Sequence, residues 1–177
     1  PLIIRDPDIK GGKKANSLVE FVDLYPTFSD LAGLERPKST IDNDGSEFNL
    51  HGTSLVPLMQ NPNQEWKKAV FSRYHYGDTI RTDRYTYSEF VNQSDSVLNI
   101  MLFDHVIDPH ENYNIADINP ELVNALSELL GNGAIGKRNS WRKFVDTSQK
   151  NKPVLRDLNL PKAIYPAENY PGNGQVF

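Results

Sequence analysis

The stretch AVFSRYHYGDTIRTDRYTYSEFVNQSDSVLNIMLFDHVIDPHENYN, residues 69–114, decides the fold of this chain. Three segments in it are rich in β-branched and aromatic residues, which favour a pleated, half-buried surface. They predict strands at Ala69–Tyr74, Thr79–Phe90 and Asn99–Asp104. The middle segment has no clean apolar face, so we expect it to be exposed on at least one side. Residues 100–103 are apolar throughout, as in a well-covered strand.

A helix is predicted before this sheet, over Asp23–Gly33. An aspartate can cap its start, a proline suits its first turn and a glycine suits its end. Its core face should hold Leu24, Phe28 and Leu31. A long polar connection and a short helical turn over residues 54–59 follow. Leu2–Ile4 has the pattern of a buried strand, so we expect the chain to be the later part of a larger polypeptide.

A second helix is predicted after the sheet, beginning at Asn119-Pro120 and ending at residues 131–133. Its apolar residues recur at helical spacing: Leu122, Val123, Leu126, Leu129 and Leu130. Four prolines then punctuate an extended tail. We therefore expect three regions: 1–60 as the end of a core domain, 61–142 as a sheet subdomain with its helix, and 143–177 as the tail.

Composition narrows the class of protein. The chain has 177 residues, about the size of one domain, with 38% hydrophobic and 24% charged residues and a mean hydropathy of -0.56. A net charge of -4 argues against a general nucleic-acid binder, which needs a basic surface. The absence of cysteine removes disulfides, zinc-thiolate sites and cysteine nucleophiles. No apolar run approaches a membrane span, and no signal peptide is visible.

Short motifs are arranged along the first 142 residues in an order and spacing that are together specific. They are residues 1–4, VDLYPT at 22–27, DLAGL at 30–34, GTSLVPL at 52–58, WKKAVFSRY at 66–74, IRTDRYTY at 80–87, LFD at 102–104 and DPHEN at 108–112. This set resembles the type I sulfatases of the alkaline-phosphatase superfamily. Residues 72–74 and 80–82 resemble the iduronate-2-sulfatase-like branch most, and residues after Trp141 have no counterpart.

The resemblance implies an α/β sulfatase fold, of which this chain is a C-terminal portion with a small antiparallel sheet and a covering helix. The family hydrolyses sulfate esters with a formylglycine made in a Cys/Ser-x-Pro-x-Arg motif, assisted by Ca²⁺ and by lysine and histidine side chains. None of these motifs lies in the chain. The resemblance therefore implies no catalytic residue and no metal ligand here. The formylglycine and Ca²⁺ would belong to the N-terminal part of the same sulfatase, and this chain alone would be inactive.

Two residues are candidates for substrate binding, His75 and Arg81. In the family, the loop that contains His75 faces the catalytic pocket, where a donor could bind sulfate or a uronic-acid carboxylate; the alternative is an exposed loop imidazole. Arg81 and Arg84 should lie on opposite sides of one strand. We expect Arg81 to contact the anionic substrate or to brace the pocket wall. The alternative for Arg81 is a structural salt bridge to Asp83 or Asp104, and Arg84 should be structural.

Other chemically suggestive groups have simpler explanations. The set Asp104, Asp108, His110, Glu111 and Asn114 does not have EF-hand spacing and is expected to form a structural turn whose carboxylates cap backbone amides. His51 and His105 are expected at the surface. Sugar stacking or, more commonly, cross-strand packing would explain four tyrosines: Tyr74, Tyr76, Tyr85 and Tyr87. Basic clusters at residues 10–14 and 137–138 favour solvated loops, and residues 92–94 form a glycosylation sequon.

The sequence thus predicts part of a sulfatase acting on a sulfated carbohydrate, which the family would place in a secreted, periplasmic or lysosomal setting. Two alternatives stay open. One is a non-catalytic module that binds anionic glycans, and the other is a phosphate or phosphonate ester hydrolase of the same superfamily. The identity of the sulfated glycan and of the sulfate position stays open as well.

Overall fold

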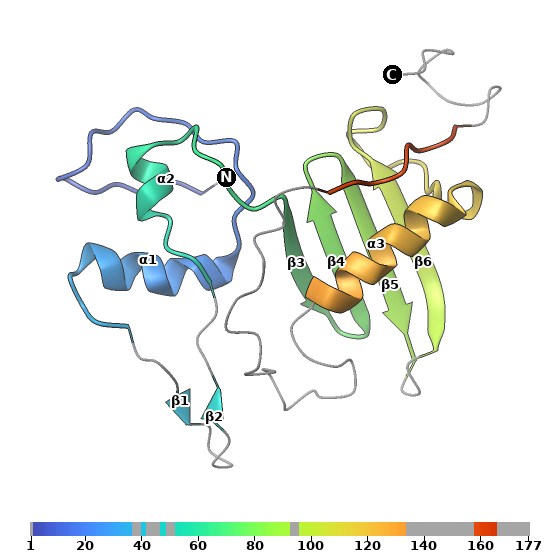
Figure 1. Ribbon diagram of the computed structural model, residues 1–177, viewed down its shortest axis with the longest axis horizontal. Helices are drawn as coiled ribbons and strands as arrows, with labels where there is room; N and C mark the ends of the chain where they lie inside the picture. The colour runs from blue at the N-terminus through green and yellow to red at the C-terminus, as the bar shows by residue number, and fades with distance from the viewer. Residues whose placement is uncertain are drawn as a thin grey trace. The chain divides into compact units, whose positions relative to one another are not determined.

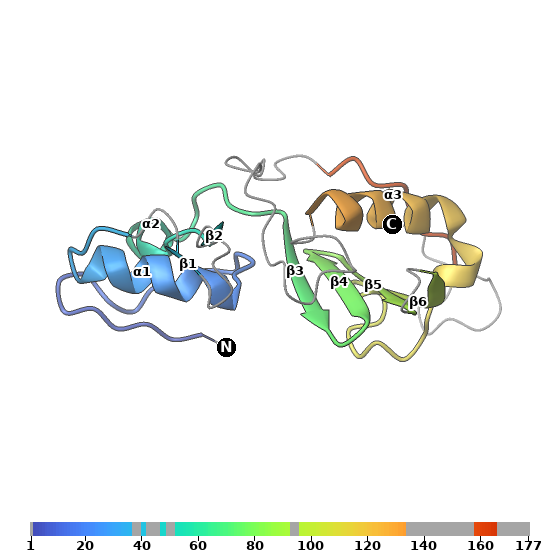
Figure 2. The same cartoon turned by 90° about the horizontal axis from the view of Figure 1, so that it is seen from below.

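The computed structural model describes residues 2–36, 40–41, 47–48, 52–92, 96–133 and 158–165. The chain divides into two compact units (Figures 1 and 2). Unit 1 contains the described residues up to Lys67, and unit 2 contains those from Lys68 onward. Among the described residues, no helix is long and apolar enough to cross a membrane.

Unit 1 is built on a short helical segment, the 3₁₀ turn η1 (Phe21–Asp23) followed by α1 (Leu24–Leu31). This confirms the helix that the sequence predicts, and Gly33 ends it with a φ of 65°. The predicted core face is wrong for Phe28, which is 58% exposed. The residues of α1 that are buried are instead Pro26, Thr27 and Ser29.

A polar cluster fixes the start of this helix. The Asp23 carboxylate is fully buried and accepts hydrogen bonds from the backbone amide of Thr53 at 2.8 Å and from Lys67 Nζ at 2.7 Å. Lys67 Nζ also reaches Glu20 Oε2 at 2.7 Å. Gly52 has a φ of 103°, and a Cβ added there would lie 2.0 Å from the Val22 carbonyl oxygen, so only glycine allows the two backbones to approach so closely.

The remaining elements of unit 1 are small. The helix α2 (Val56–Gln60) confirms the predicted helical turn, and Lys13 Nζ donates to two carbonyls at its end, those of Met59 and Gln60. Strands β1 (Thr40–Ile41) and β2 (Glu47–Phe48) pair with each other in an antiparallel manner.

The predicted strand at Leu2–Ile4 is wrong for this structure, because the described part of the chain pairs no strand with these residues. A strand requires a partner for its backbone groups. Leu2 is 46% exposed and Ile3 is 87% exposed, so the apolar pattern of these residues is not satisfied within unit 1.

Unit 2 is a four-stranded antiparallel meander in the order β3-β4-β5-β6. Its strands are β3 (Ala69–Tyr74), β4 (Gly77–Thr82), β5 (Tyr85–Val91) and β6 (Val97–Asp104). The first predicted strand is confirmed to the residue, and β6 begins two residues before the predicted start. The single predicted strand Thr79–Phe90 is wrong. It is divided by a tight turn, in which the Thr82 hydroxyl accepts a hydrogen bond from the amide of Tyr85 at 2.8 Å.

Helix α3 (Pro120–Gly133) lies across one face of this sheet, as Figures 1 and 2 show. The side chains between the helix and the sheet are almost completely buried. They are Leu122, Leu126 and Leu130 of the helix and Ile80, Tyr87 and Leu102 of the sheet. Full burial of such a side chain stabilises a fold by about 1.5–3 kcal/mol. The covering helix on a small antiparallel sheet is therefore confirmed.

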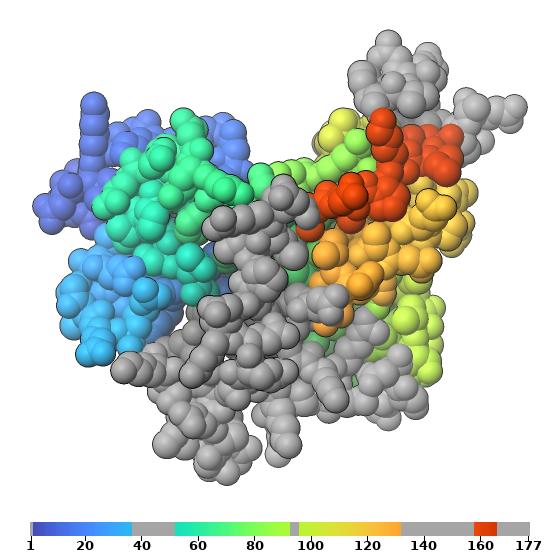
Figure 3. Space-filling view, in the orientation of Figure 1, coloured from blue at the N-terminus to red at the C-terminus, as the bar shows by residue number. Residues whose placement is uncertain are grey.

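The extended segment 158–165 also belongs to unit 2 and runs beside α3, visible as the red atoms next to the orange helix in Figure 3. It is tied down just before the helix, where Asn119 Nδ2 donates to the carbonyl of Ile164 at 3.0 Å and Asn119 Oδ1 accepts from its amide. The face of the sheet opposite to the helix is called here the open face. The register places Thr79, Arg81, Thr86 and Ser88 on it, beside Met101 and Phe103 of β6.

Candidate functional site

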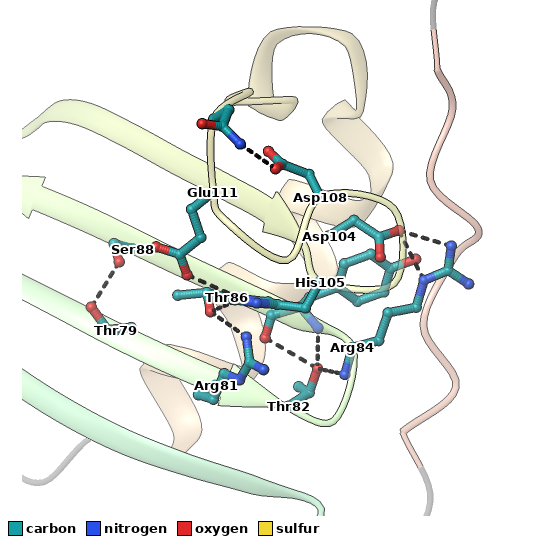
Figure 4. A network of polar contacts seen from close by, with 12 residues as sticks. Thr79, Arg81, Thr82, Arg84, Thr86, Ser88, Asp104, His105, Asp108 and Glu111 are labelled. Atoms are coloured by element: carbon teal, nitrogen blue, oxygen red, sulfur yellow. Dashed lines mark hydrogen bonds and ion pairs between the residues drawn. The ribbon is translucent and has the colours of Figure 1, made fainter. Parts of the chain in front are cut away.

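The register of the sheet lines up four polar side chains on the open face. Thr79 pairs with Ser88, and Arg81 pairs with Thr86, between β4 and β5. The hydroxyls of Thr79 and Ser88 are 2.7 Å apart, and Arg81 Nη1 donates to Thr86 Oγ1 at 2.8 Å. Figure 4 shows these pairs side by side. The alternation of a β-strand places them together, because their sequence neighbours Ile80 and Tyr87 point to the helix.

His105 extends this row from the end of β6. Its Nε2 lies 2.7 Å from Thr86 Oγ1 and 3.0 Å from Glu111 Oε1 (Figure 4). A proton on Nε2 is a single donor that these two oxygens share, since the hydroxyl oxygen and an ionised carboxylate are both acceptors. The side chain of His105 is only 19% exposed, so His105 is not the surface residue that the sequence predicts. Arg81, Thr86, His105 and Glu111 are called the open-face quartet below.

Burial and charge shift the ionisation of the quartet. Desolvation, and then the positive charge of Arg81, lower the pKa of His105, which favours a neutral imidazole. Desolvation also lowers the pKa of Arg81, against the opposing effect of Glu111 and Asp83. Glu111 itself has a φ of 57°, a conformation that non-glycine residues seldom adopt and that is enriched at functional sites.

A second cluster, on the helix side of the sheet, joins the β4–β5 turn to the end of β6. Arg84 Nε donates to Asp104 Oδ2 at 2.9 Å, and the Asp104 side chain is fully buried. The Tyr165 hydroxyl bonds to the same carboxylate. The hydrogen bond to Asp104 raises the pKa of Arg84, and burial followed by that carboxylate raises the pKa of Tyr165. Arg84 is therefore structural, as expected, and it is Arg84 rather than Arg81 that pairs with Asp104.

The turn after β6 is also structural. Asp104 Oδ1 accepts from the amide of Val106 at 3.0 Å, and Asp108 Oδ2 accepts from the amide of Tyr113 at 2.8 Å. Asn114 Oδ1 accepts from the amide of Leu102 at 2.9 Å. These bonds confirm the expectation that side chains of this turn cap backbone amides, and they occupy the oxygens that first suggest a metal site.

His75 lies in the two-residue turn between β3 and β4, with a φ of 51°. Exposed tyrosines flank it: Tyr74 is 76% exposed and Tyr76 is 47% exposed. The Tyr74 and His75 rings meet edge to face, with centroids 4.4 Å apart. Arg73 and Asp78 close the base of the hairpin with two hydrogen bonds, of which Nη2 to Oδ2 is 3.0 Å. The tip is thus an exposed aromatic group on a braced support.

The structure does not bring the two predicted substrate-binding residues together. His75 precedes the first residue of β4, and Arg81 is the fifth residue of that strand. Arg81 lies four residue steps beyond Gly77 along the strand, or about 13 Å. The four tyrosines are divided in the same way. Tyr85 and Tyr87 are 4% and 0% exposed, so packing explains them.

Several other predicted features lie outside the described residues: His51, the basic pair at 137–138, and residues 93–94 of the sequon. Among the residues that the structure does describe, no group of three or more histidine, aspartate or glutamate side chains could hold a metal ion. The described residues therefore do not fit a Ca²⁺ site.

Comparison with known proteins gives a consistent result. Residues 1–132 match the family model "N-sulphoglucosamine sulphohydrolase, C-terminal". Arylsulfatase K of Homo sapiens is 30% identical over 146 residues, covering 73% of this chain and 24% of that protein. An N-acetylglucosamine-6-O-sulfatase of Bacteroides thetaiotaomicron is 33% identical over 130 residues, covering 65% of this chain and 21% of that protein.

Solved structures are similar to part of the chain as well. One, in complex with its substrate D-glucosamine-2-N,6-O-disulfate, is 28% identical and covers 62% of this chain and 22% of its own, with a TM-score of 0.46. The chain thus spans about a quarter of the length of the curated relatives that it matches, 24% for the human protein.

Proposed function

Because the chain belongs to the sulfatase family and matches its C-terminal portion, we propose that it works as part of a sulfuric ester hydrolase that acts on a sulfated carbohydrate. The observation that carries this proposal is the family match over residues 1–132. The relatives named above are sulfatases, and one of them is named for a sulfated sugar.

In this proposal the chemistry belongs to the N-terminal part of the same enzyme. That part would carry the formylglycine and would bind Ca²⁺, which supplies positive charge for the sulfate oxygens. The chain described here contributes a wall of the substrate pocket. The family also suggests a secreted, periplasmic or lysosomal setting, where sulfated glycans occur.

His75 and Arg81 have different roles in this wall. His75 is exposed at the tip of a braced hairpin, so its imidazole is free to approach a sulfate or carboxylate without a change in the backbone. Arg81 is held by Thr86 at 2.8 Å, which uses one of five guanidinium N–H donors. We assign both residues to substrate binding. Their separation means that they would contact different parts of an extended saccharide.

The test is an assay of sulfate release from sulfated saccharides by the enzyme that contains this chain. Replacement of His75 by alanine should lower kcat/KM by about tenfold or more, the loss of one charge-assisted hydrogen bond. Arg81→Ala should do the same or more. His110→Ala and Arg5→Ala are matched controls, because both residues are exposed and lie outside the proposed wall.

Three results separate this proposal from its alternatives. A Cys/Ser-x-Pro-x-Arg motif in the coding sequence before Pro1 supports the enzyme, and a short leader in its place favours a glycan-binding module. Release of phosphate in preference to sulfate would assign the enzyme to the phosphate ester hydrolases. Full sulfatase turnover by the 177-residue chain alone would contradict the assignment of chemistry to another part.

A further inference from the structure

The extended segment 158–165 lies beyond residues 1–132, the part of the chain that matches the sulfatase family model. It belongs to unit 2 and runs beside α3, as Figures 1 and 3 show. Residues 134–157 separate it in the sequence from the end of that helix. The family match therefore does not account for the contacts that hold this segment, and they can be considered as a binding site in their own right.

Two side chains of unit 2 recognise the backbone of the segment. Asn119 Nδ2 donates to the carbonyl of Ile164 at 3.0 Å, and Asn119 Oδ1 accepts from the amide of the same residue. The hydroxyl of Tyr85 forms a hydrogen bond with the backbone of Ala163. Asn119 and Tyr85 are 3% and 4% exposed, whereas Ile164 is 66% exposed. The site thus reads the backbone of Ile164 and leaves its side chain largely in water.

The tyrosine that follows is recognised through its side chain. The Tyr165 hydroxyl donates to Asp104 Oδ2 and accepts from Arg84 Nη2 at 3.4 Å. Arg84 Nε also donates directly to Asp104 Oδ2 at 2.9 Å, so the charged pair has a bond that does not involve the tyrosine (Figure 4). A phenolic hydroxyl both donates and accepts, and it therefore fits between this acceptor and this donor.

We propose that unit 2 carries a peptide-binding site, formed by Tyr85, Asn119 and the Arg84–Asp104 pair, and that segment 158–165 is its tethered ligand. The class of ligand is an extended peptide in which a tyrosine follows a residue with any side chain. The segment is a separable element, so unit 2 folds without it and the same peptide binds from solution. The site does not rest on the proposed function, since neither candidate substrate-binding residue takes part in it.

The tether explains why few contacts are sufficient. A tethered ligand has an effective concentration on the order of mM. Occupancy by the tethered segment therefore needs a dissociation constant of the free peptide below about 1 mM. Hydrogen bonds to a buried amide and to a charged carboxylate are of the kind that can supply such an affinity. The apolar core between α3 and the sheet is formed by residues of those elements, so it does not depend on the segment.

Fluorescence anisotropy with a labelled synthetic peptide of residues 158–165 tests the proposal. The receptor is the 177-residue chain with Ile164→Pro and Tyr165→Ala, which remove the amide and the hydroxyl of the resident segment and leave the site itself unchanged. We expect saturable binding with a Kd below about 1 mM. The parent chain should bind the peptide more weakly by a factor of at least about two, because its tethered segment competes at an effective concentration on the order of mM.

Matched variants separate the recognition of the backbone from that of the side chain. Tyr165→Phe in the peptide should weaken binding about fivefold, since it removes the hydroxyl that bonds to Asp104. Ile164→Ser in the peptide is the control and should change the Kd by no more than about twofold, because this side chain lies largely in water. Tyr85→Phe in the receptor should weaken binding about fivefold, because it keeps the buried ring and removes the hydroxyl that bonds to Ala163.

The circular dichroism spectrum of the receptor shows whether the segment is separable. Loss of the folded spectrum in the Ile164→Pro, Tyr165→Ala chain would overturn the proposal, because the segment would then be an integral part of the fold. Absence of saturable binding up to several mM would overturn it too. Equal affinities of the parent and Tyr165→Phe peptides would show that the tyrosine is not recognised. None of these outcomes bears on the proposed function, because no measurement uses the release of sulfate.

Discussion

The two units of this chain bury opposite kinds of side chain. In unit 2 the fully buried residues are mostly large and apolar, such as Tyr87, Leu102 and Leu126. In unit 1 the fully buried residues are Asp23 and Thr27, while three aromatic rings face outward. Unit 2 therefore has a completed core between its sheet and α3. Unit 1 buries Leu55 and Leu58 as well, but polar contacts of Asp23 and Thr27 fix its helix and leave large aromatic side chains in water.

The largest expected effect comes from truncating the core of unit 2. Leu126→Ala removes a side chain that is 0% exposed and should lower the free energy of unfolding by about 2–5 kcal/mol. Phe28→Ala in unit 1 is the contrasting variant and should change it by no more than about 0.5 kcal/mol in this chain, because the ring is already in water. Urea denaturation followed by circular dichroism measures both. Equal losses would show that the two units do not differ as described.

Unit 1 should instead be sensitive at its backbone. Gly52→Ala places a methyl group 2.0 Å from the Val22 carbonyl oxygen, at a φ of 103°. Overpacking and the left-handed backbone together should cost about 2–3 kcal/mol. Gly12→Ala is the matched control, since its φ of 78° is also positive but nothing lies within 4 Å of the added Cβ. Limited proteolysis of unit 1 should accelerate more for Gly52→Ala than for Gly12→Ala, whose cost is the left-handed backbone alone, and similar rates for both variants would contradict the close approach.

A smaller effect is expected where segment 158–165 meets unit 2. Tyr165→Phe removes a hydroxyl that bonds to the buried Asp104 carboxylate, and should lower the free energy of unfolding by about 1 kcal/mol. Lys162→Ala, at an exposed position of the same segment, should have no measurable effect. The urea midpoints of the two variants and of the parent protein measure these changes in stability. An unchanged midpoint for Tyr165→Phe would show that this segment adds nothing to the finished core.

The same comparison explains which parts of the fold the sequence could predict. The strand Ala69–Tyr74 and helix α3 follow from local patterns, because unit 2 satisfies its apolar pattern within the chain. The pattern also shows that Leu24 and Phe28 share a helix face, but it cannot show whether that face is covered, since covering depends on tertiary contacts that are remote in sequence. The same reason applies to Leu2–Ile4.

Two further differences between the sequence-based expectations and the structure are explained by side-chain contacts. The turn between β4 and β5 contains no glycine or proline, and its one turn former, Asp83, lies within a run of strand-forming residues. The Thr82 hydroxyl closes the turn. Sequence reasoning expects His105 at the surface, but the structure gives it two partners. Thr86 lies 19 residues earlier on another strand, and Glu111 approaches through a left-handed backbone. The available signal is the position of His105 in the sequence, between the IRTDRYTY motif that contains Arg81 and the DPHEN motif that contains Glu111.

The smallest expected effect is a dependence of stability on pH that arises from His105 in the open-face quartet. The pKa of His105 is lowered below the usual 6.5, so the folded state prefers the neutral imidazole and the unfolded state binds a proton more readily. The stability from this preference is complete above pH 6.5 and is lost as the pH falls toward the folded pKa. Arg81 opposes protonation, while Glu111, Asp104 and Asp108 favour it, so the net effect should be small.

His105→Asn should therefore flatten the decline in stability between pH 6.5 and pH 5, because asparagine cannot titrate. His110→Asn, in the exposed part of the same turn, should leave the slope as it is. The Tm of both variants and of the parent protein, measured across this pH range, tests this expectation. If the slope of the parent protein persists in His105→Asn, acid sensitivity arises elsewhere and the quartet does not titrate on unfolding. If it disappears, unit 2 contains a polar group whose burial is conditional on pH.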